Sequence, residues 1–216
     1  MYQVTRNNSD MYGLKYIPSI EPQFSNVHDW TNLCEGIKVQ REFSDANREE
    51  LLKQFLKIRD KCKCIVEIGV ARNAPDESST GRFLDNKLTE TVYIGIDIES
   101  KTFLNSVADN IYTIQADSKY KNKVIKLMKE LNLDSIDFLF IDGFHSVLQV
   151  LFDWSYAEFV SPFGIIGMHD TNAHPGPYTI FDAIDEKIFT KTKYCLGNND
   201  WGISFIEKKV DNSKDR

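Results

Sequence analysis

The chain has 216 residues, of which 42% are hydrophobic and 27% are charged, a composition typical of a globular protein with a substantial core. Its formal net charge of −6 gives no broad attraction to nucleic acid or to anionic lipid, so neither is an expected partner. No apolar run approaches the length of a membrane span, and charges interrupt the N-terminus where a signal peptide needs an apolar stretch, so we expect a cytoplasmic protein with no membrane partner.

The first regular element that the sequence predicts is a helix that begins after residue 43. Residues 1–43 are irregular and rich in aromatic side chains, and we interpret them as an N-terminal covering segment. Ser44 is a candidate N-cap for a helix whose apolar face carries Leu51, Phe55 and Ile58.

Short apolar segments alternate with helical patterns along the rest of the chain. Strands are predicted over 64–70, 91–97, 111–116, 138–141 and 165–168, and helices over 120–131, 147–157 and 180–189. This alternation predicts an α/β fold with a parallel sheet that helices cover on both faces. Residues 194–196 and 201–206 flank a Gly-Asn-Asn-Asp turn signal and predict a closing hairpin, followed by a polar tail over 208–216.

Acidic residues follow two of these strands, those over 138–141 and 165–168. Asp142 comes directly after the first strand, and His169 and Asp170 follow the second. Because reacting groups gather beyond the carboxyl ends of the strands in open α/β sheets, we expect them to converge. Two neighbouring carboxylates repel unless a cation neutralises them or one is protonated, and Mg²⁺ is commonly held by one or two carboxylates. We favour a metal site over the alternative, in which both aspartates cap helices.

Histidines accompany both acidic motifs. His145 follows Asp142 in the turn before a helix, where an imidazole of near-neutral pKa can take a proton from a substrate hydroxyl. His169 is placed to complete a metal shell or to orient Asp170. His174, in a loop rich in proline and glycine, suits a pocket wall and ranks third. A lone histidine is more often structural, so the weight given to His145 comes from its neighbours.

Polar residues also end the first three strands. Glu67 and Gly69 lie where nucleotide-type ligands meet doubly wound sheets, and Gly69 permits close backbone approach. Asp97 can accept hydrogen bonds from a ribose diol, and Asp117 with Ser118 can bracket a purine ring. The alternatives are a plain strand-to-helix turn, a solvated strand end and a helix N-cap, respectively.

Taken together, these motifs resemble the class I S-adenosylmethionine-dependent methyltransferases. Within them the chain looks most like the metal-dependent O-methyltransferase branch, which includes macrocin-type sugar O-methyltransferases and cephalosporin-hydroxylase-like proteins. The motifs that carry the resemblance are Glu67-Ile-Gly69, Gly95-Ile-Asp97, Gln115-Ala-Asp-Ser118, Ile141-Asp-Gly-Phe-His145 and Gly164-Ile-Ile-Gly-Met-His-Asp170. The resemblance implies a methyltransferase domain over 44–207 with a doubly wound, Rossmann-like, mostly parallel sheet of seven strands, helices on both faces and the last strand antiparallel.

The resemblance also implies a role for each site residue. Asp142, Asp170 and His169 would hold a divalent cation, with Mg²⁺ the first expectation and Mn²⁺ or another transition metal the alternative. His145 would act as general base in an in-line methyl transfer to a hydroxyl of a small molecule or sugar. The residues expected to bind S-adenosylmethionine are Glu67, Gly69, Asn73, Ser79, Asp97, Asp117 and Ser118.

The chain departs from the pattern of this family at three places. Asn73 stands where a further glycine is usual, residues 74–78 resemble an insertion, and His169 stands where several metal-binding relatives carry an acidic residue. Imidazole suits transition metals better than Mg²⁺. Two other classes are alternatives: a catalytically silent binding module that keeps the fold, and a nicotinamide-dependent oxidoreductase, against which the missing Gly-x-Gly-x-x-Gly counts. A homo-oligomer is also left open.

Overall fold

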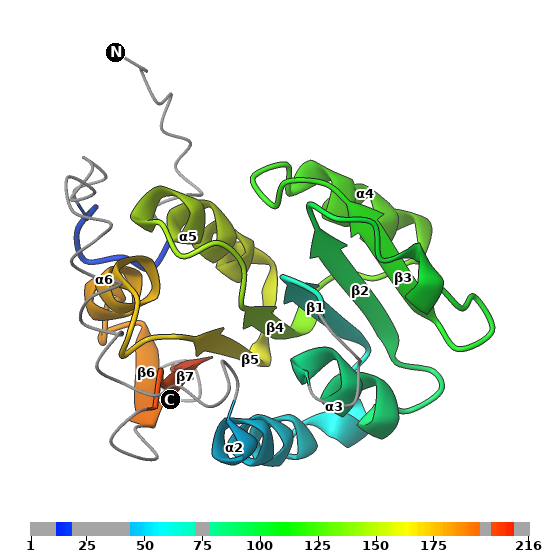
Figure 1. Ribbon diagram of the computed structural model, residues 1–216, viewed down its shortest axis with the longest axis horizontal. Helices are drawn as coiled ribbons and strands as arrows, with labels where there is room; N and C mark the ends of the chain where they lie inside the picture. Colours follow the sequence, from blue (N-terminus) through cyan, green and yellow to red (C-terminus); the bar gives the residue numbers. More distant parts are fainter. Residues whose placement is uncertain (1–11, 19–43, 72–77, 195–199, 210–216) are drawn as a thin grey trace, which may run out of the picture.

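The computed structural model describes residues 12–18, 44–71, 78–194 and 200–209. These residues form a seven-stranded sheet in the order β3-β2-β1-β4-β5-β7-β6 (Figure 1). Strands β1 to β5 pair in parallel, and β7 runs antiparallel to both of its neighbours. The Rossmann-like sheet with an antiparallel last strand is therefore confirmed. Its strands are β1 (Cys64–Ile68), β2 (Val92–Asp97), β3 (Ile111–Gln115), β4 (Ile136–Ile141), β5 (Val160–His169), β6 (Phe189–Tyr194) and β7 (Ile203–Lys208).

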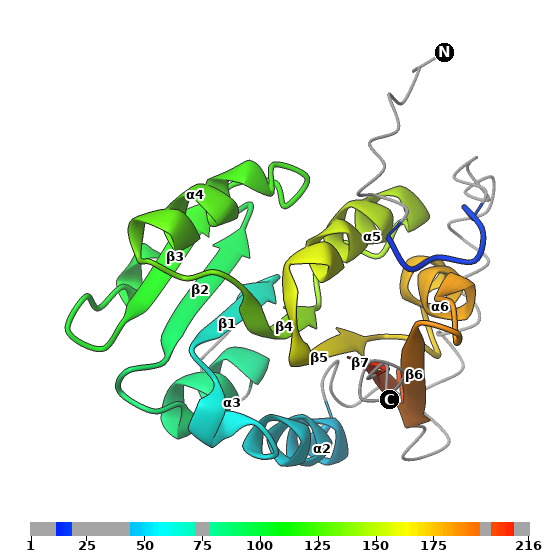
Figure 2. The ribbon, with the colours of Figure 1, turned by 180° about the vertical axis from the view of Figure 1, so that it is seen from behind.

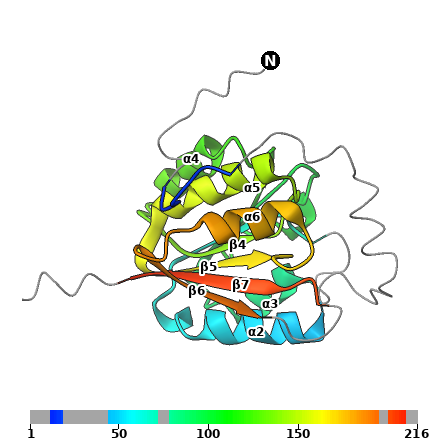
Figure 3. The same cartoon turned by 90° about the vertical axis from the view of Figure 1, so that its left-hand side faces the viewer.

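Helices cover both faces of this sheet, as the sequence predicts. One layer holds α2 (Asp45–Leu56) and α3 (Ser79–Asn86), and the other holds α4 (Asn122–Glu130), α5 (Val147–Trp154) and α6 (Pro175–Ala183) (Figure 3). Short 3-10 helices span η3 (Arg59–Lys61), η5 (Thr102–Leu104) and η6 (Ser155–Phe159). No helix in the described part of the chain is long and apolar enough to cross a membrane.

Each face of the sheet has its own apolar core. Strands β1 and β4 are buried at every position, which explains why their sequences are apolar except for Glu67 and Asp137. On the α2 side, Phe55, Phe83 and Phe138 pack edge to face with ring centroids 5.3–5.7 Å apart. On the other side, Trp154 is fully buried and donates from Nε1 to the Tyr12 carbonyl at 2.7 Å. Residues 12–18 therefore pack on the layer that contains α5.

Two predicted elements near the C-terminus are placed differently in the structure. The helix expected over 180–189 begins earlier, as α6 with Pro175 at its start, because proline is preorganised for the first turn. The same stretch ends in the sheet, since Phe189 is the first residue of β6. Strand β6 therefore precedes the 194–196 segment that the sequence indicated. Its alternating exposed lysines and threonines are typical of an edge strand, which lies at the far side of the sheet from β3 (Figure 2).

Other expectations differ only in extent. Ser44 accepts a hydrogen bond from the Asn47 backbone nitrogen at 3.1 Å, which confirms it as the N-cap of α2. The helix expected over 147–157 divides into α5 and η6, and β5 is longer than the predicted strand. Most of the covering segment, the turn over 197–199 and the tail over 210–216 lie outside the described residues.

Candidate active site

The ends of β4 and β5 bring the two acidic motifs together. Asp142 directly follows β4, whereas His169 is the last residue of β5 and Asp170 comes next. The strands pair in parallel with Ile141 opposite Met168, so Asp142 and His169 lie at the same edge of the sheet. The convergence that was inferred from strand ends is found in the structure.

The carboxylate of Asp170 lies between two imidazoles. Its Oδ1 is 2.9 Å from His169 Nδ1, and its Oδ2 is 2.6 Å from His145 Nε2. Asp142 Oδ1 lies 3.3 Å from the same nitrogen of His169. Asp170 also adopts a φ of +61°, a left-handed conformation that non-glycine residues adopt at a cost of about 1–3 kcal/mol and that clusters at functional sites.

Burial makes these charges interact strongly. His169 is 3% exposed and Asp170 is 2% exposed. Burial by itself would lower the pKa of His169, but the carboxylates of Asp170 and Asp142 outweigh it and raise this pKa to about 10. Burial opposes ionisation of Asp170, yet the neighbouring His169 and His145 hold the pKa of its carboxyl well below its usual range. The two carboxylates therefore favour a positive charge at this place, whether it is carried by a protonated imidazole or by a bound cation.

A second pair of rings extends the cluster. His145 and His174 stack with centroids 4.1 Å apart and an angle of 19° between the planes, and His174 meets the edge of Trp201 at 5.1 Å. A Cβ on Gly176 would lie 2.3 Å from the His145 carbonyl oxygen, so only glycine lets the start of α6 approach this loop. Sequence reasoning ranked His174 low and missed Trp201. Trp201 could have been predicted from its place just before the last strand, because this antiparallel strand begins beside His169, at the end of β5.

These side chains fit a divalent cation. Two overlapping groups have ligand atoms within 4.8 Å of one another: Asp142, His169 and Asp170, and His145, Asp170 and His174. Among the described residues, Asp170 Oδ1, His145 Nε2 and His174 Nε2 are buried and have no hydrogen-bond partner. Buried polar atoms are normally paired, and a cation at this place would give these atoms a further partner.

Glu67 lies beneath the turn after β1 and is fully buried. Its carboxylate accepts hydrogen bonds from the hydroxyls of Ser79, Thr80 (2.8 Å) and Tyr93. Burial raises the pKa of Glu67 to about 7, and the three hydroxyls oppose this shift. Glu67 and Ser79 therefore join β1 to the start of α3. Tyr93 was not singled out from the sequence.

Gly69 connects this turn to the acidic motif after β4. It has a φ of +85°, and a Cβ at this position would lie 2.1 Å from the Asp142 carbonyl oxygen. Asp142 in turn donates from its backbone nitrogen to Ile68 at 2.9 Å. Asn73, the other residue expected in this turn, lies outside the described residues.

The residues after β2 and β3 are engaged with the backbone and with each other. Asp97 accepts from the backbone nitrogens of Val70 and Glu99, each at 2.8 Å, and so fixes the end of β1. Asp117 pairs with Lys119, whose Nζ lies 2.8 Å from its carboxylate. Asp97 therefore ends β2 and contacts the residue that follows Gly69, whereas Asp117 lies just beyond the end of β3.

Ser118 belongs to a buried polar network that the sequence analysis missed. Its hydroxyl contacts Asp153 Oδ1 at 2.5 Å and Gln149 Nε2 at 2.7 Å, and its carbonyl accepts from Tyr156 at 2.7 Å. Asp153 is fully buried, and this burial raises the pKa of its carboxyl to about 7. The helical spacing of Gln149, Asp153 and Tyr156 on an otherwise apolar helix was the signal that could have revealed it.

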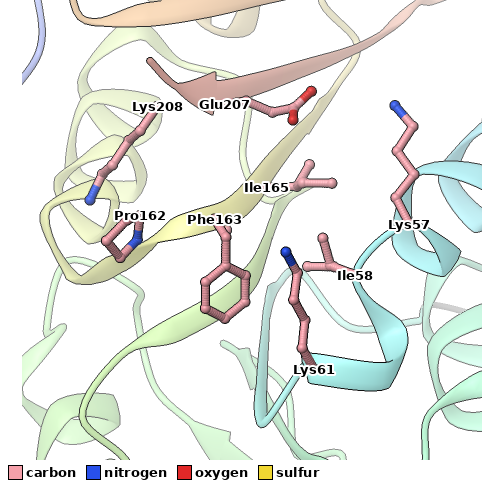
Figure 4. A pocket seen from close by; sticks show the side chains of 9 residues that line it. Lys57, Ile58, Lys61, Pro162, Phe163, Ile165, Glu207 and Lys208 are labelled. Carbon is pink, nitrogen blue, oxygen red and sulfur yellow. The ribbon is translucent and has the colours of Figure 1, made fainter. Parts of the chain in front are cut away.

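A surface pocket lies away from this site. It is lined by residues in and just before η3, by residues near the start of β5 and by residues at the end of β7 (Figure 4). Within its wall, Ile165 lies opposite Glu207 in the pairing of β5 with β7. Lys61 sits over the Phe163 ring at 4.4 Å, and Lys208 donates to the Val160 carbonyl. The pocket faces the amino ends of the parallel strands and is separate from the Asp142 cluster.

Comparisons with known proteins now bear on the fold. Neither a family model nor a curated protein sequence matches this chain. Solved structures do. The methyltransferase MycE from the mycinamycin biosynthetic pathway, in complex with Mg, SAH and mycinamycin VI, matches with a TM-score of 0.58 and 16% identity, over 86% of this chain and 56% of MycE. The chain thus spans little more than half of that protein.

Two further structures match over nearly their whole lengths. The O-methyltransferase from Bacillus cereus, in complex with SAH, has a TM-score of 0.53 and 13% identity over 87% of this chain and 93% of its own. CalS11, a TDP-rhamnose 3'-O-methyltransferase in calicheamicin biosynthesis, has a TM-score of 0.55 and 11% identity over 83% and 92%.

The chain has the class I methyltransferase fold. In this methyltransferase fold the ends of β1, β2 and β3 carry Gly69, Asp97 and Asp117, and the ends of β4 and β5 carry the Asp142 and Asp170 motifs. All of them lie on one edge of one sheet.

Proposed function

We propose that the protein is an S-adenosylmethionine-dependent O-methyltransferase that acts on a hydroxyl of a small molecule or sugar, assisted by a divalent cation. The observation that carries the proposal is the cluster of Asp142, His145, His169 and Asp170 at one edge of a methyltransferase fold. MycE, with Mg and mycinamycin VI in its complex, and CalS11, a TDP-rhamnose 3'-O-methyltransferase, support this class of acceptor.

The cofactor would be held along the ends of the first three strands. Gly69 has no side chain and would let the cofactor approach the backbone closely. Asp97 would bind the ribose, and Asp117 with Ser118 would flank the adenine. Glu67, Ser79 and Asn73 are the other residues that we predict to bind the cofactor. S-adenosylmethionine supplies a methyl group on a positively charged sulfur, which is ready for direct transfer to an oxygen nucleophile.

His145 would remove the proton from the acceptor hydroxyl. Its Nε2 lies 2.6 Å from Asp170 Oδ2, so this carboxylate would stabilise the positive charge that the ring gains when it takes the substrate proton. The ring is fixed on its face by the stack with His174. Asp142, Asp170 and His169 would hold the cation, which supplies charge stabilisation for the developing alkoxide.

Calorimetry with S-adenosylmethionine, with and without divalent cations, tests the proposal first. We expect binding of the cofactor, followed by methyl transfer to a panel of hydroxylated small molecules and sugars. The substitution His145→Ala should leave cofactor binding intact and lower turnover by about 10²–10⁴-fold, the usual contribution of a general base. Absence of cofactor binding under every metal condition would refute the proposal.

A further inference from the structure

We propose that the cation site selects a borderline transition-metal ion of the Co²⁺ to Zn²⁺ class over Mg²⁺, with His169 Nδ1 as one of its ligands. This inference rests on the proposed function, because it concerns the cation that is expected beside the acceptor hydroxyl. It goes further in that it assigns a nitrogen ligand and therefore a class of metal.

The donor set carries the first part of the argument. Asp142 and Asp170 offer oxygen, whereas His169 offers nitrogen, and these ligand atoms lie within 4.8 Å of one another. His169 Nδ1 is the nitrogen that faces the carboxylates, at 3.3 and 2.9 Å, while its Nε2 lies 3.3 Å from Asn47 Nδ2 on the other side of the ring. A Mg²⁺ site is normally built from oxygen ligands alone, whereas imidazole suits Zn²⁺, Co²⁺ and Ni²⁺.

The contacts of the two carboxylate oxygens of Asp170 also support a bound cation. Its Oδ1 is buried and accepts no hydrogen bond among the described residues, although it lies only 2.9 Å from His169 Nδ1. His169 Nδ1 and Asp170 Oδ1 are therefore close enough for one cation to contact both atoms. The other oxygen of Asp170 faces His145, so Oδ1 is the oxygen left for the cation.

Burial makes the nitrogen ligand hard to avoid. His169 is 3% exposed and is the last residue of β5, so its ring cannot turn out into water. A hydrated Mg²⁺ ion at this place would have to meet the imidazole, because Asp142 and Asp170 lie on either side of it. A cation that favours nitrogen gains a ligand from the same arrangement.

The test uses the full chain after removal of metals with a chelator. Equilibrium dialysis with Mg²⁺, Mn²⁺, Co²⁺ or Zn²⁺ alone should give binding of Co²⁺ and Zn²⁺ at least about 100-fold tighter than that of Mg²⁺. The visible absorption of bound Co²⁺ should report a nitrogen ligand. This spectrum is recorded on the unmodified protein, so it does not depend on a variant that folds.

A matched pair of variants locates the site. His169→Glu replaces nitrogen by oxygen and should weaken Co²⁺ and Zn²⁺ binding by about 10–100-fold while it strengthens Mg²⁺ binding. His174→Gln should leave the order of affinities unchanged. If His174→Gln abolished Co²⁺ binding and His169→Glu did not, the ion would belong to the His145–His174 group and the assignment of His169 would be overturned.

Cofactor binding, measured on the same samples, separates this inference from the proposed function. Equal or tighter binding of Mg²⁺, or no metal binding at all, overturns the metal assignment even if S-adenosylmethionine still binds. In the latter case protonated His169 alone would balance the two carboxylates. Loss of cofactor binding with intact Co²⁺ selectivity would instead refute the methyltransferase and leave the metal site standing.

Discussion

Gly69 and Asp142 meet backbone to backbone, so closely that a Cβ on Gly69 would lie 2.1 Å from the Asp142 carbonyl oxygen. This contact joins the turn after β1, where the cofactor is expected, to the loop that carries the acidic motif. The position of one motif is therefore set by the other, and a side chain at Gly69 would disturb both.

The substitution Gly69→Ala is expected to lower the free energy of unfolding by about 2 kcal/mol or more, because alanine at a φ of +85° is strained and its Cβ meets backbone atoms. Urea denaturation measures this loss. Gly143→Ala is the matched control, since its Cβ would meet only side-chain atoms at 3.3 Å and beyond. Equal losses in the two variants would contradict the role assigned to the contact.

The stack of His145 on His174 predicts a positioning effect on turnover. His174→Ala removes the ring that fixes His145, and we expect kcat to fall by about 2–13-fold, the equivalent of the about 0.5–1.5 kcal/mol typical of a ring pair. His174→Phe keeps a ring and should recover most of the loss. The dissociation constant for S-adenosylmethionine should stay the same in both variants, and a parallel loss of cofactor affinity would argue for a general structural defect instead.

Buried Asp153 predicts a specific dependence of stability on pH. Its pKa of about 7 in the folded protein lies above the value of about 3.9 expected in the unfolded chain. Folding therefore favours the protonated form, and this contribution to stability is complete below about pH 4 and is lost as the pH rises through about 7. Glu67, whose pKa is also raised to about 7, acts in the same direction.

Asp153→Asn removes the titrating group from this site. Between about pH 5 and pH 8 the unmodified protein should lose free energy of unfolding, and the variant should lose about 2 kcal/mol less. Urea denaturation at the two pH values measures the difference. Exposed Asp134→Asn serves as the control and should keep the full pH dependence. An identical pH dependence in the unmodified protein and Asp153→Asn would show that Asp153 does not titrate in this range.

The sheet was predictable where burial on both faces leaves a continuous apolar run. Strands β1 and β4 are close to this kind, with one acidic residue each, and their predicted places agree with the structure to within two residues at one end. Strand β6 was placed too late, because Phe189–Tyr194 alternates polar residues at the sheet edge and resembles a loop in sequence. α6 begins at Pro175, in a stretch whose prolines and glycine were interpreted as a pocket wall.

Some residues of the candidate site were predicted from the sequence and others were not, for a similar reason. Asp142, His145, His169 and Asp170 were found because strand ends converge by topology, which requires no knowledge of side-chain packing. The contacts of Asn47, Trp201 and Asp153 were not found, since they arise from α2, the start of β7 and the face of α5, which meet only in the folded chain.

Because each oxygen of Asp170 faces a different imidazole, the acid–base group and the ion would share one supporting residue. A variant at Asp170 would therefore impair deprotonation and metal loading at once, and its kinetics would not reveal which had failed. Under the proposed function, a substitution at position 169 could change the ion that is preferred, whereas a substitution at position 170 would remove the carboxylate on which both roles depend.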